Sequence, residues 1–148
     1  MDAIWVLTSS TDIDSLMCVM LKKASSDYSS MQSDILELQE LARKFCADRD
    51  WEQYHNPKEL AIGLITESSE LLEHFRFKTE KQMDEMFRDP AKKTAIAEEI
   101  ADALYFILRF GQKYDIDLAA AVKDKIKKNE LKYPIEKSKG LNKKYNEL

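Results

Sequence analysis

Glycine, proline, cysteine and histidine are all scarce in this chain of 148 residues. It contains three glycines, three prolines, two cysteines and two histidines. With 44% hydrophobic and 34% charged residues, this composition is typical of a soluble, globular and helix-rich protein. Cys18 and Cys46 fit neither a Cys-x-x-Cys motif nor a Cys/His zinc spacing, which argues against those zinc sites. A reducing compartment is therefore the simplest expectation.

Long apolar runs are absent as well. No stretch approaches the roughly 18 residues of a membrane-spanning helix, so we expect no membrane partner. The N-terminus has neither the basic start nor the cleavage pattern of a signal peptide. Internal repeats and low-complexity tracts are not seen. Together these absences predict a cytoplasmic protein.

Four segments have the apolar periodicity of helices or the capping residues that begin and end helices. They run from about Ser33 to Asp48, Asn56 to Lys78, Ala91 to Tyr114 and Asp117 to Leu131. The second start is the clearest, because Asn56 can cap, Pro57 suits the first helical position and Glu59 completes a capping-box pattern. Between the second and third helices we expect a polar connection. After Pro134 we expect a tail that is extended or disordered unless a partner holds it. With no strand in sight, the predicted fold is an all-α, four-helix bundle.

Two pairs of carboxylates are the most informative feature. Glu67 and Glu70 are three residues apart, as are Glu99 and Asp102, so each pair projects from one face of its helix. Antiparallel packing could bring the two pairs to one level. Four like charges repel unless a cation neutralises them, and oxygen ligands favour Mg²⁺ or Mn²⁺ over zinc. The spacing therefore predicts a metal site.

These acids also resemble the pattern of a known family. E-x-x-E followed by E-x-x-D is similar to the motifs of the MazG-like all-α nucleoside triphosphate pyrophosphohydrolases, and within them of the dCTP pyrophosphatase type. The resemblance includes residues 49–55 and 125–134 and covers roughly Asp34 to Tyr133. We accordingly expect three parts in the chain. They are an N-terminal extension (residues 1–30), a MazG-like domain (31–135) and a basic C-terminal tail (136–148).

The resemblance implies an activity. It is the Mg²⁺-dependent cleavage of a nucleoside triphosphate, dCTP or a related deoxynucleotide, to a nucleoside monophosphate and pyrophosphate. The biological role that it implies is house-cleaning of the nucleotide pool. A bound metal would screen the triphosphate and make a water easier to deprotonate. Glu98 or Glu73 could orient or deprotonate that water, and both alternatives stay open. The resemblance further implies that dimerisation completes the bundle, as a homodimer or homotetramer, with no stable nucleic-acid partner.

Nine further residues resemble the family's nucleotide contacts. They are Trp51, His55, Phe77, Lys78, Phe106, Lys125, Asn129, Lys132 and Tyr133. Trp51 would stack on the base with His55 nearby, while Asn129 and Lys132 would contact phosphate, together with Lys125.

Two aromatic positions depart from the dCTP type. Phe77 stands where that type has a second tryptophan, and Phe106 where it usually has a tyrosine. Both positions belong to the expected base pocket. The departures leave the base preference open and do not touch the metal chemistry.

Two other protein classes place acids on helices. A ferritin-like di-iron bundle requires E-x-x-H on two helices, whereas Glu70 is followed three residues later by Glu73, and Glu99 by Asp102. A non-catalytic interaction protein with a solvated acidic face is the alternative. That alternative predicts no loss of function when Glu70 is neutralised.

Overall fold

The computed structural model describes residues 34–148, and all regular structure in this part of the chain is helical. A first helix is described over residues 34–47. It is followed by η1 (Trp51–Tyr54), α2 (Pro57–Phe75), α3 (Glu80–Met86), α4 (Pro90–Lys113), α5 (Leu118–Lys132), α6 (Ile135–Ser138) and η2 (Tyr145–Glu147). The predicted all-α class is confirmed. The expected N-terminal extension and the cap at Ser33 lie outside the described residues.

The long helices begin where the sequence predicted. Asn56 accepts a hydrogen bond from the backbone N–H of Glu59 at 3.0 Å, with proline at the first position of α2. Asp89 and Asp117 cap α4 and α5 through their side chains in the same way. The Glu59 side chain departs from the capping-box prediction, because its carboxylate pairs with Lys58 at 2.8 Å. A one-sided cap is therefore sufficient to start α2.

The segments between and after the long helices contain more helical structure than the sequence predicted. Thr79 and Gln82 form a capping box that starts the short helix α3 within the expected polar connection. Helix α2 ends at Phe75, earlier than predicted, since Phe77 has a φ of 60° in the left-handed region that a right-handed helix cannot use. The tail beyond Pro134 contains α6 and η2 and so is not simply extended.

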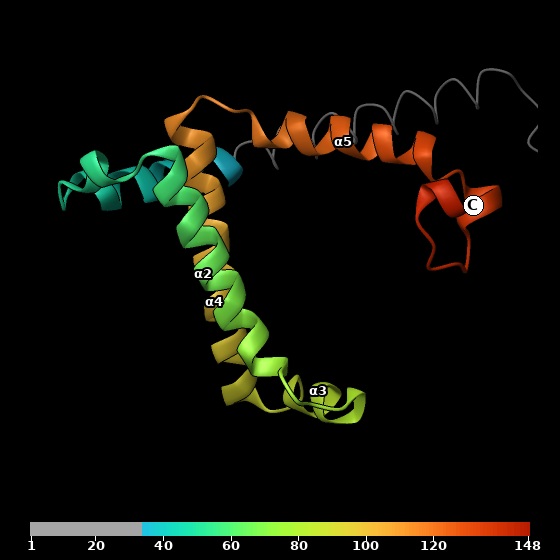
Figure 1. Ribbon diagram of the computed structural model, residues 1–148. Coiled ribbons are helices and arrows are strands. Elements are labelled where there is room, and N and C mark those ends of the chain that lie inside the picture. The colour runs from blue at the N-terminus through green and yellow to red at the C-terminus, as the bar shows by residue number, and fades with distance from the viewer. Residues whose placement is uncertain (1–33) are drawn as a thin grey trace, which may run out of the picture.

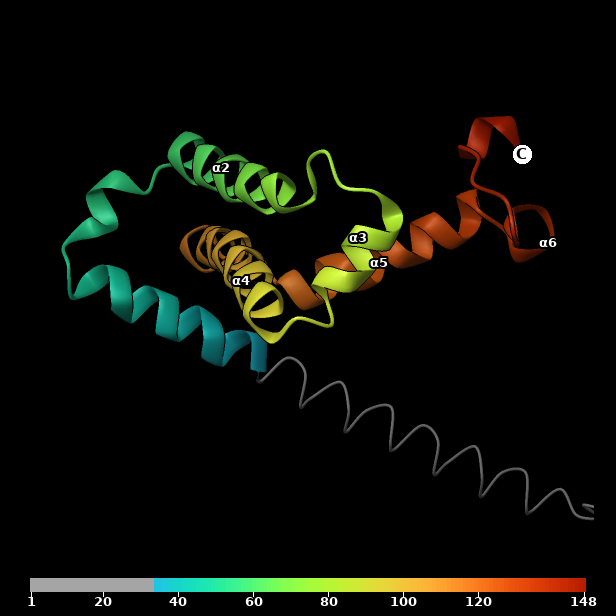
Figure 2. The same cartoon turned by 90° about the horizontal axis from the view of Figure 1, so that it is seen from below.

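Helices α2 and α4 form the centre of the molecule. They pack side by side and run in opposite directions, as the colours of Figure 1 show. The helix of residues 34–47 lies on the other side of α4, where Gln39 donates a hydrogen bond to the carbonyl of Leu108 at 3.4 Å (Figure 2). Helix α5 leaves the top of α4 and extends away from the pair. Of the four long helices in residues 34–148, three therefore lie together and α5 stands apart.

The core of the described residues is small. Seven apolar side chains are buried: Ala42, Cys46, Leu60, Met86, Ile96, Leu108 and Ala119. Many larger ones are exposed, among them Leu41 and Phe45 on the first helix and Val122, Ile126 and Leu131 on α5. None of the described helices has the length and apolar character needed to cross a bilayer. Exposed apolar surface of this extent is typical of a chain that another protein surface covers.

Candidate metal centre

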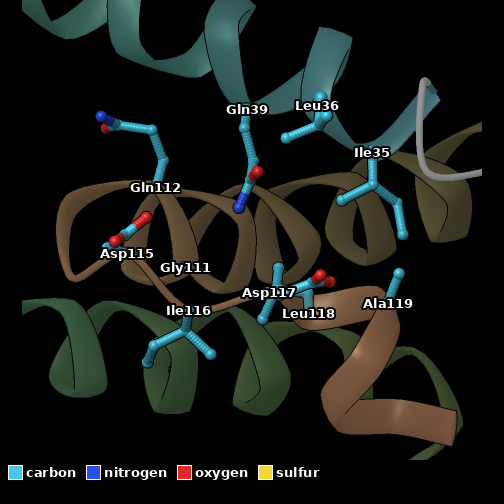
Figure 3. A pocket seen from close by; sticks show the side chains of 10 residues that line it. All are labelled: Ile35, Leu36, Gln39, Gly111, Gln112, Asp115, Ile116, Asp117, Leu118 and Ala119. Atoms are coloured by element: carbon cyan, nitrogen blue, oxygen red, sulfur yellow. The ribbon is translucent and has the colours of Figure 1, made fainter.

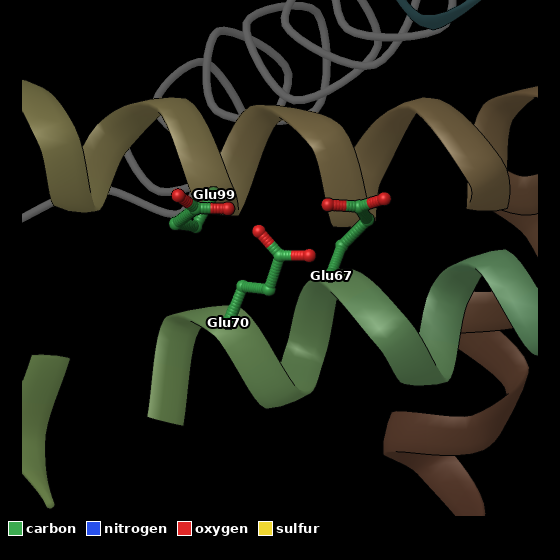
Figure 4. A group of neighbouring side chains, drawn as sticks. All are labelled: Glu67, Glu70 and Glu99. Carbon is green, nitrogen blue, oxygen red and sulfur yellow. The ribbon is translucent and has the colours of Figure 1, made fainter. Parts of the chain in front are cut away.

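Three of the predicted ligands meet between α2 and α4. Glu67 and Glu70 project from α2 toward Glu99 on α4 (Figure 4). Each offers a carboxylate oxygen, and these three oxygens lie within 4.8 Å of one another. Glu67 and Glu99 are half-buried, while Glu70 is exposed. Because clustered carboxylate oxygens are the ligands of hard divalent cations, this group could hold a metal ion.

Asp102 lies outside that group of three but in the same electrostatic neighbourhood. Burial raises the pKa of Glu67 above its ordinary value, and the negative charges of Glu70, Asp102 and Glu99 raise it further. The other three predicted acids therefore all lie close enough to act on the Glu67 carboxyl. A cation among them would reverse the effect and favour the ionised form of Glu67.

Three other polar groups surround the acids. His74 Nε2 lies 3.9 Å from Glu99 Oε1, so this histidine borders the group. Glu73 is exposed and paired with Arg76 at 2.9 Å. Glu98 is exposed on α4 beside Glu99, and successive residues on a helix do not face the same way. The choice between Glu73 and Glu98 as the group that activates water stays a prediction.

Three of the predicted base-binding residues, Trp51, His55 and Phe106, lie near the start of α2. His55 and Phe106 line a pocket of about 510 Å³ together with Gly63. Trp51 is close by in η1, where its ring packs edge-on against Phe45 with the centroids 5.7 Å apart. Since 42% of Trp51 is exposed, its ring is accessible to a flat ligand. The structure thus brings three of the predicted residues to one end of the helix pair.

The remaining predicted residues follow the end of α2 or belong to the α5 region. Phe77 is 89% exposed after α2, and Lys78 lines a pocket together with Glu73 and His74, which border the acids. The other four belong to α5 or follow it, far from the metal site in Figure 1: Lys125, Asn129, Lys132 and Tyr133. There, Tyr145 packs edge-on against the Tyr133 ring, with centroids 6.1 Å apart.

A further pocket contains no predicted site residue. It has about 510 Å³ and lies between the helix of residues 34–47, the end of α4 and the start of α5 (Figure 3). Gln39, Gln112 and Asp115 point into it among apolar neighbours such as Ile35 and Leu118. Its lining includes no member of the carboxylate group.

Sequence reasoning missed a buried polar network beneath η1. Arg109 of α4 has no solvent exposure, pairs with Glu52 of η1, and donates from Nε to Nδ1 of His55 at 3.3 Å. Lys113 joins it, with Nζ 3.7 Å from a Glu52 carboxylate oxygen. Burial lowers the pKa of His55, and the charges of Arg109 and Lys113 lower it further, against a smaller effect of Glu52. The one available signal was a single charge within the apolar run 103–110.

Cys46 of the first helix also belongs to this network. Its Sγ is 2.8 Å from the hydroxyl of Tyr105 and 3.6 Å from Nδ1 of His55. Burial and the bond with Cys46 raise the pKa of Tyr105 above its ordinary value. Cys46 forms no disulfide and is fully buried.

Comparison with known proteins identifies the family. The sequence model of the MazG-like family matches residues 64–148. dCTP pyrophosphatase 1 of Rattus norvegicus and that of Homo sapiens are each 32% identical over 119 residues, which is 80% of this chain and 70% of theirs.

A solved structure has the same fold. It is the crystal structure of a pyrophosphatase from Archaeoglobus fulgidus, with a TM-score of 0.64 and 37% identity, covering 68% of this chain and 93% of that one. These relatives confirm the predicted enzyme class, a nucleotide diphosphatase. The chain belongs to the MazG-like family.

Proposed function

We propose that this protein is a Mg²⁺-dependent pyrophosphohydrolase that cleaves dCTP or a related deoxynucleoside triphosphate between the α and β phosphates. The products are a nucleoside monophosphate and pyrophosphate, and the role is house-cleaning of the nucleotide pool. One observation carries the proposal: the carboxylates of Glu67, Glu70 and Glu99 converge between α2 and α4. The similarity to dCTP pyrophosphatases supports the choice of substrate.

The donor set suits Mg²⁺, or Mn²⁺ with the same preference for oxygen. Glu67, Glu70 and Glu99 would hold the ion, with Asp102 as the fourth acid near it. Bound Mg²⁺ neutralises charge on a triphosphate and makes a coordinated water more acidic. Glu98 or Glu73 would orient or deprotonate the attacking water.

The base pocket and the acids are neighbours along the same helix pair. Gly63 precedes Glu67 by four residues on α2, and Phe106 follows Asp102 by four residues on α4. Four residues correspond to about 6 Å of helix. A base held beside Phe106, His55 and Trp51 would therefore place its triphosphate toward the carboxylates.

A second copy of the chain would complete the site. Helix α5 carries Lys125, Asn129 and Lys132 away from the acids of its own chain. In a homodimer or homotetramer, these residues and Tyr133 would contact the phosphates bound by another copy. Phe77 and Lys78, at the exposed end of α2, would likewise act in the assembled protein. Covering the exposed apolar surface of the first helix and α5 favours the same assembly.

The test is a panel of canonical and modified NTPs and dNTPs, with Mg²⁺ and with a chelator. We expect metal-dependent release of pyrophosphate and monophosphate in equal amounts, fastest for a cytidine deoxynucleotide. Release of inorganic phosphate alone would place the cleavage at another bond. The absence of turnover on the whole panel would contradict the proposal and favour a non-catalytic interaction protein.

A further inference from the structure

We propose that Arg109 is a positioning residue that fixes the tautomer of His55, so that His55 donates a hydrogen bond from Nε2 to an acceptor atom of the bound base. This inference rests on the proposed function, because it concerns the same nucleotide pocket. Arg109 is outside the carboxylate group, and its bond to His55 gives one hydrogen bond in base recognition a direction.

The direction follows from the chemistry of arginine. A guanidinium has five N–H donors, has no acceptor, and stays protonated in proteins. Since Arg109 Nε donates to His55 Nδ1 at 3.3 Å, Nδ1 must carry a lone pair and no proton. A neutral imidazole has one protonated nitrogen, so the proton of His55 lies on Nε2.

Arg109 is itself held firmly. Its side chain has no solvent exposure, and Glu52 and Gln112 bind its two terminal nitrogens. A planar guanidinium held at both ends has little freedom to turn its Nε–H away from the ring. The geometry thus imposes one tautomer on His55, whereas a free imidazole exchanges between two.

The groups facing His55 also oppose its protonation. Arg109 and Lys113 approach from α4, and burial adds to their effect, while Glu52 of η1 acts in the opposite direction. From the first helix, the Cys46 thiol faces Nδ1 and can donate to it. A proton on Nδ1 would meet the N–H of Arg109 directly, so the charged ring loses this contact.

A fixed Nε2–H determines which atoms of a base the pocket can bind. His55 lines the pocket with Phe106 and Gly63, and Nε2 lies across the ring from Arg109. A donor there pairs with a carbonyl oxygen or an unprotonated ring nitrogen, and a pyrimidine such as cytosine offers both. A base that presents an N–H at that point would leave two donors facing each other, which costs binding free energy.

Nitrogen-15 NMR tests the tautomer directly in the full chain. The protein has only two histidines, His55 and His74, so a His74→Gln sample assigns both rings. In the wild type we expect His55 at pH 7.5 to be neutral, with its proton on Nε2. A proton on Nδ1, or a charged ring at that pH, would overturn the proposal.

Three variants separate the effect of the hydrogen bond from that of the charge. Arg109→Gln removes the Nε donor, so the His55 tautomers should mix and KM should rise about tenfold with a smaller change in kcat, as for the loss of one hydrogen bond to the ligand. Lys113→Gln removes a nearby charge that has no bond to the ring, and should leave the tautomer unchanged. Arg109→Lys, which keeps the buried charge, should behave like Arg109→Gln.

The outcomes are separable from those of the proposed function. If the wild type turns over no triphosphate, the function fails, while the NMR spectrum still decides the tautomer. If folded Arg109→Gln or Arg109→Lys keeps the Nε2–H tautomer, or loses it with KM unchanged, the proposal is wrong. Should both variants unfold, as circular dichroism would reveal, the wild-type spectrum alone decides it.

Discussion

At the level of single residues, the acids between α2 and α4 destabilise one another by charge repulsion but form the proposed metal site. Without a metal they repel one another, whereas in the proposed function they would be the ligands of a metal. Glu70→Gln removes one ligand and one negative charge. We expect metal-dependent turnover to fall about a hundredfold or more, while the melting temperature without metal stays the same or rises. Glu80→Gln on α3, which makes the same charge change away from the acids, should keep full activity.

Activity retained in Glu70→Gln would refute the ligand assignment. A large loss of helical structure in that variant would instead make its activity uninformative, and Glu99→Gln would then replace it. Steady-state kinetics with circular dichroism on the same samples distinguishes these cases.

The raised pKa of Glu67 predicts a pH dependence of stability. Its pKa is higher in the folded than in the unfolded protein, so the folded state binds more protons between the two values. The contribution of this group is therefore fully present at low pH and is lost as the pH rises through the folded pKa. Glu67→Gln is always neutral and lacks this loss.

The comparison needs metal-free protein. From pH 4.5 to 7, urea unfolding should show Glu67→Gln gaining stability relative to the wild type, with the two closest at the acidic end. Added Mg²⁺ should reverse that order at neutral pH, since only the wild type keeps the ligand. A constant difference at every pH would contradict the electrostatic origin.

Residue spacing predicted the acids but not Arg109. Two residues three positions apart lie on one face of any helix. The shared direction of each acid pair, Glu67 with Glu70 and Glu99 with Asp102, could therefore be predicted from the sequence. The partners of Arg109 lie on other elements, at Glu52 and His55. No periodicity within α4 indicates which loop will cover a buried charge.

At the scale of elements, the contact between α2 and α4 depends on a glycine. A Cβ atom at Gly63 would overlap the ring of Phe106. Alanine is the better helix former by about 1 kcal/mol, yet moving an aromatic ring between packed helices costs about 1–3 kcal/mol. We expect Gly63→Ala to lose stability in thermal unfolding and to raise KM, because Phe106 lines the base pocket.

Ser69→Ala is the matched control on α2, where the side chain is exposed and bonds only its own helix. It should be neutral or slightly stabilising. A stabilised Gly63→Ala with unchanged KM would show that Phe106 moves freely and that the close packing is not required.

Helix α5 supplies the second prediction at this scale. If its Asn129 serves the acids of another copy, Glu70→Gln and Asn129→Ala are each inactive alone but complement each other when mixed. Random exchange of subunits in a dimer with two sites would restore about a quarter of the wild-type activity. Activity no higher than that of the two variants assayed separately would place α5 with its own acids.

Element boundaries show the limits of sequence patterns. Caps at Asn56 and Asp89 are local, so the starts of α2 and α4 were predictable. Helix α3 was missed because a seven-residue helix has too short an apolar period to detect, although Thr79 and Gln82 gave a capping pattern. The departure of α5 from the bundle depends on tertiary packing, which no local pattern in the sequence specifies.

At the scale of the whole molecule, the small core predicts that association and folding are linked. Few apolar side chains are buried, and a groove between the first helix and α4 is lined by Leu38, Leu41 and Leu104. We expect the melting temperature to rise with protein concentration, as it does for obligate oligomers. Light scattering at micromolar concentration should give at least twice 17.2 kDa. A monomer whose melting temperature is independent of concentration would contradict this.

Phosphorus NMR of a single reaction with dCTP, run with Mg²⁺ and again with excess chelator, tests the proposed reaction most directly. We expect the triphosphate signals to be replaced by those of a monophosphate and of pyrophosphate, in equal amounts and only with Mg²⁺. Products that form equally fast in the chelated sample, or signals of dCDP and inorganic phosphate, would contradict a carboxylate-held metal acting on the α–β bond.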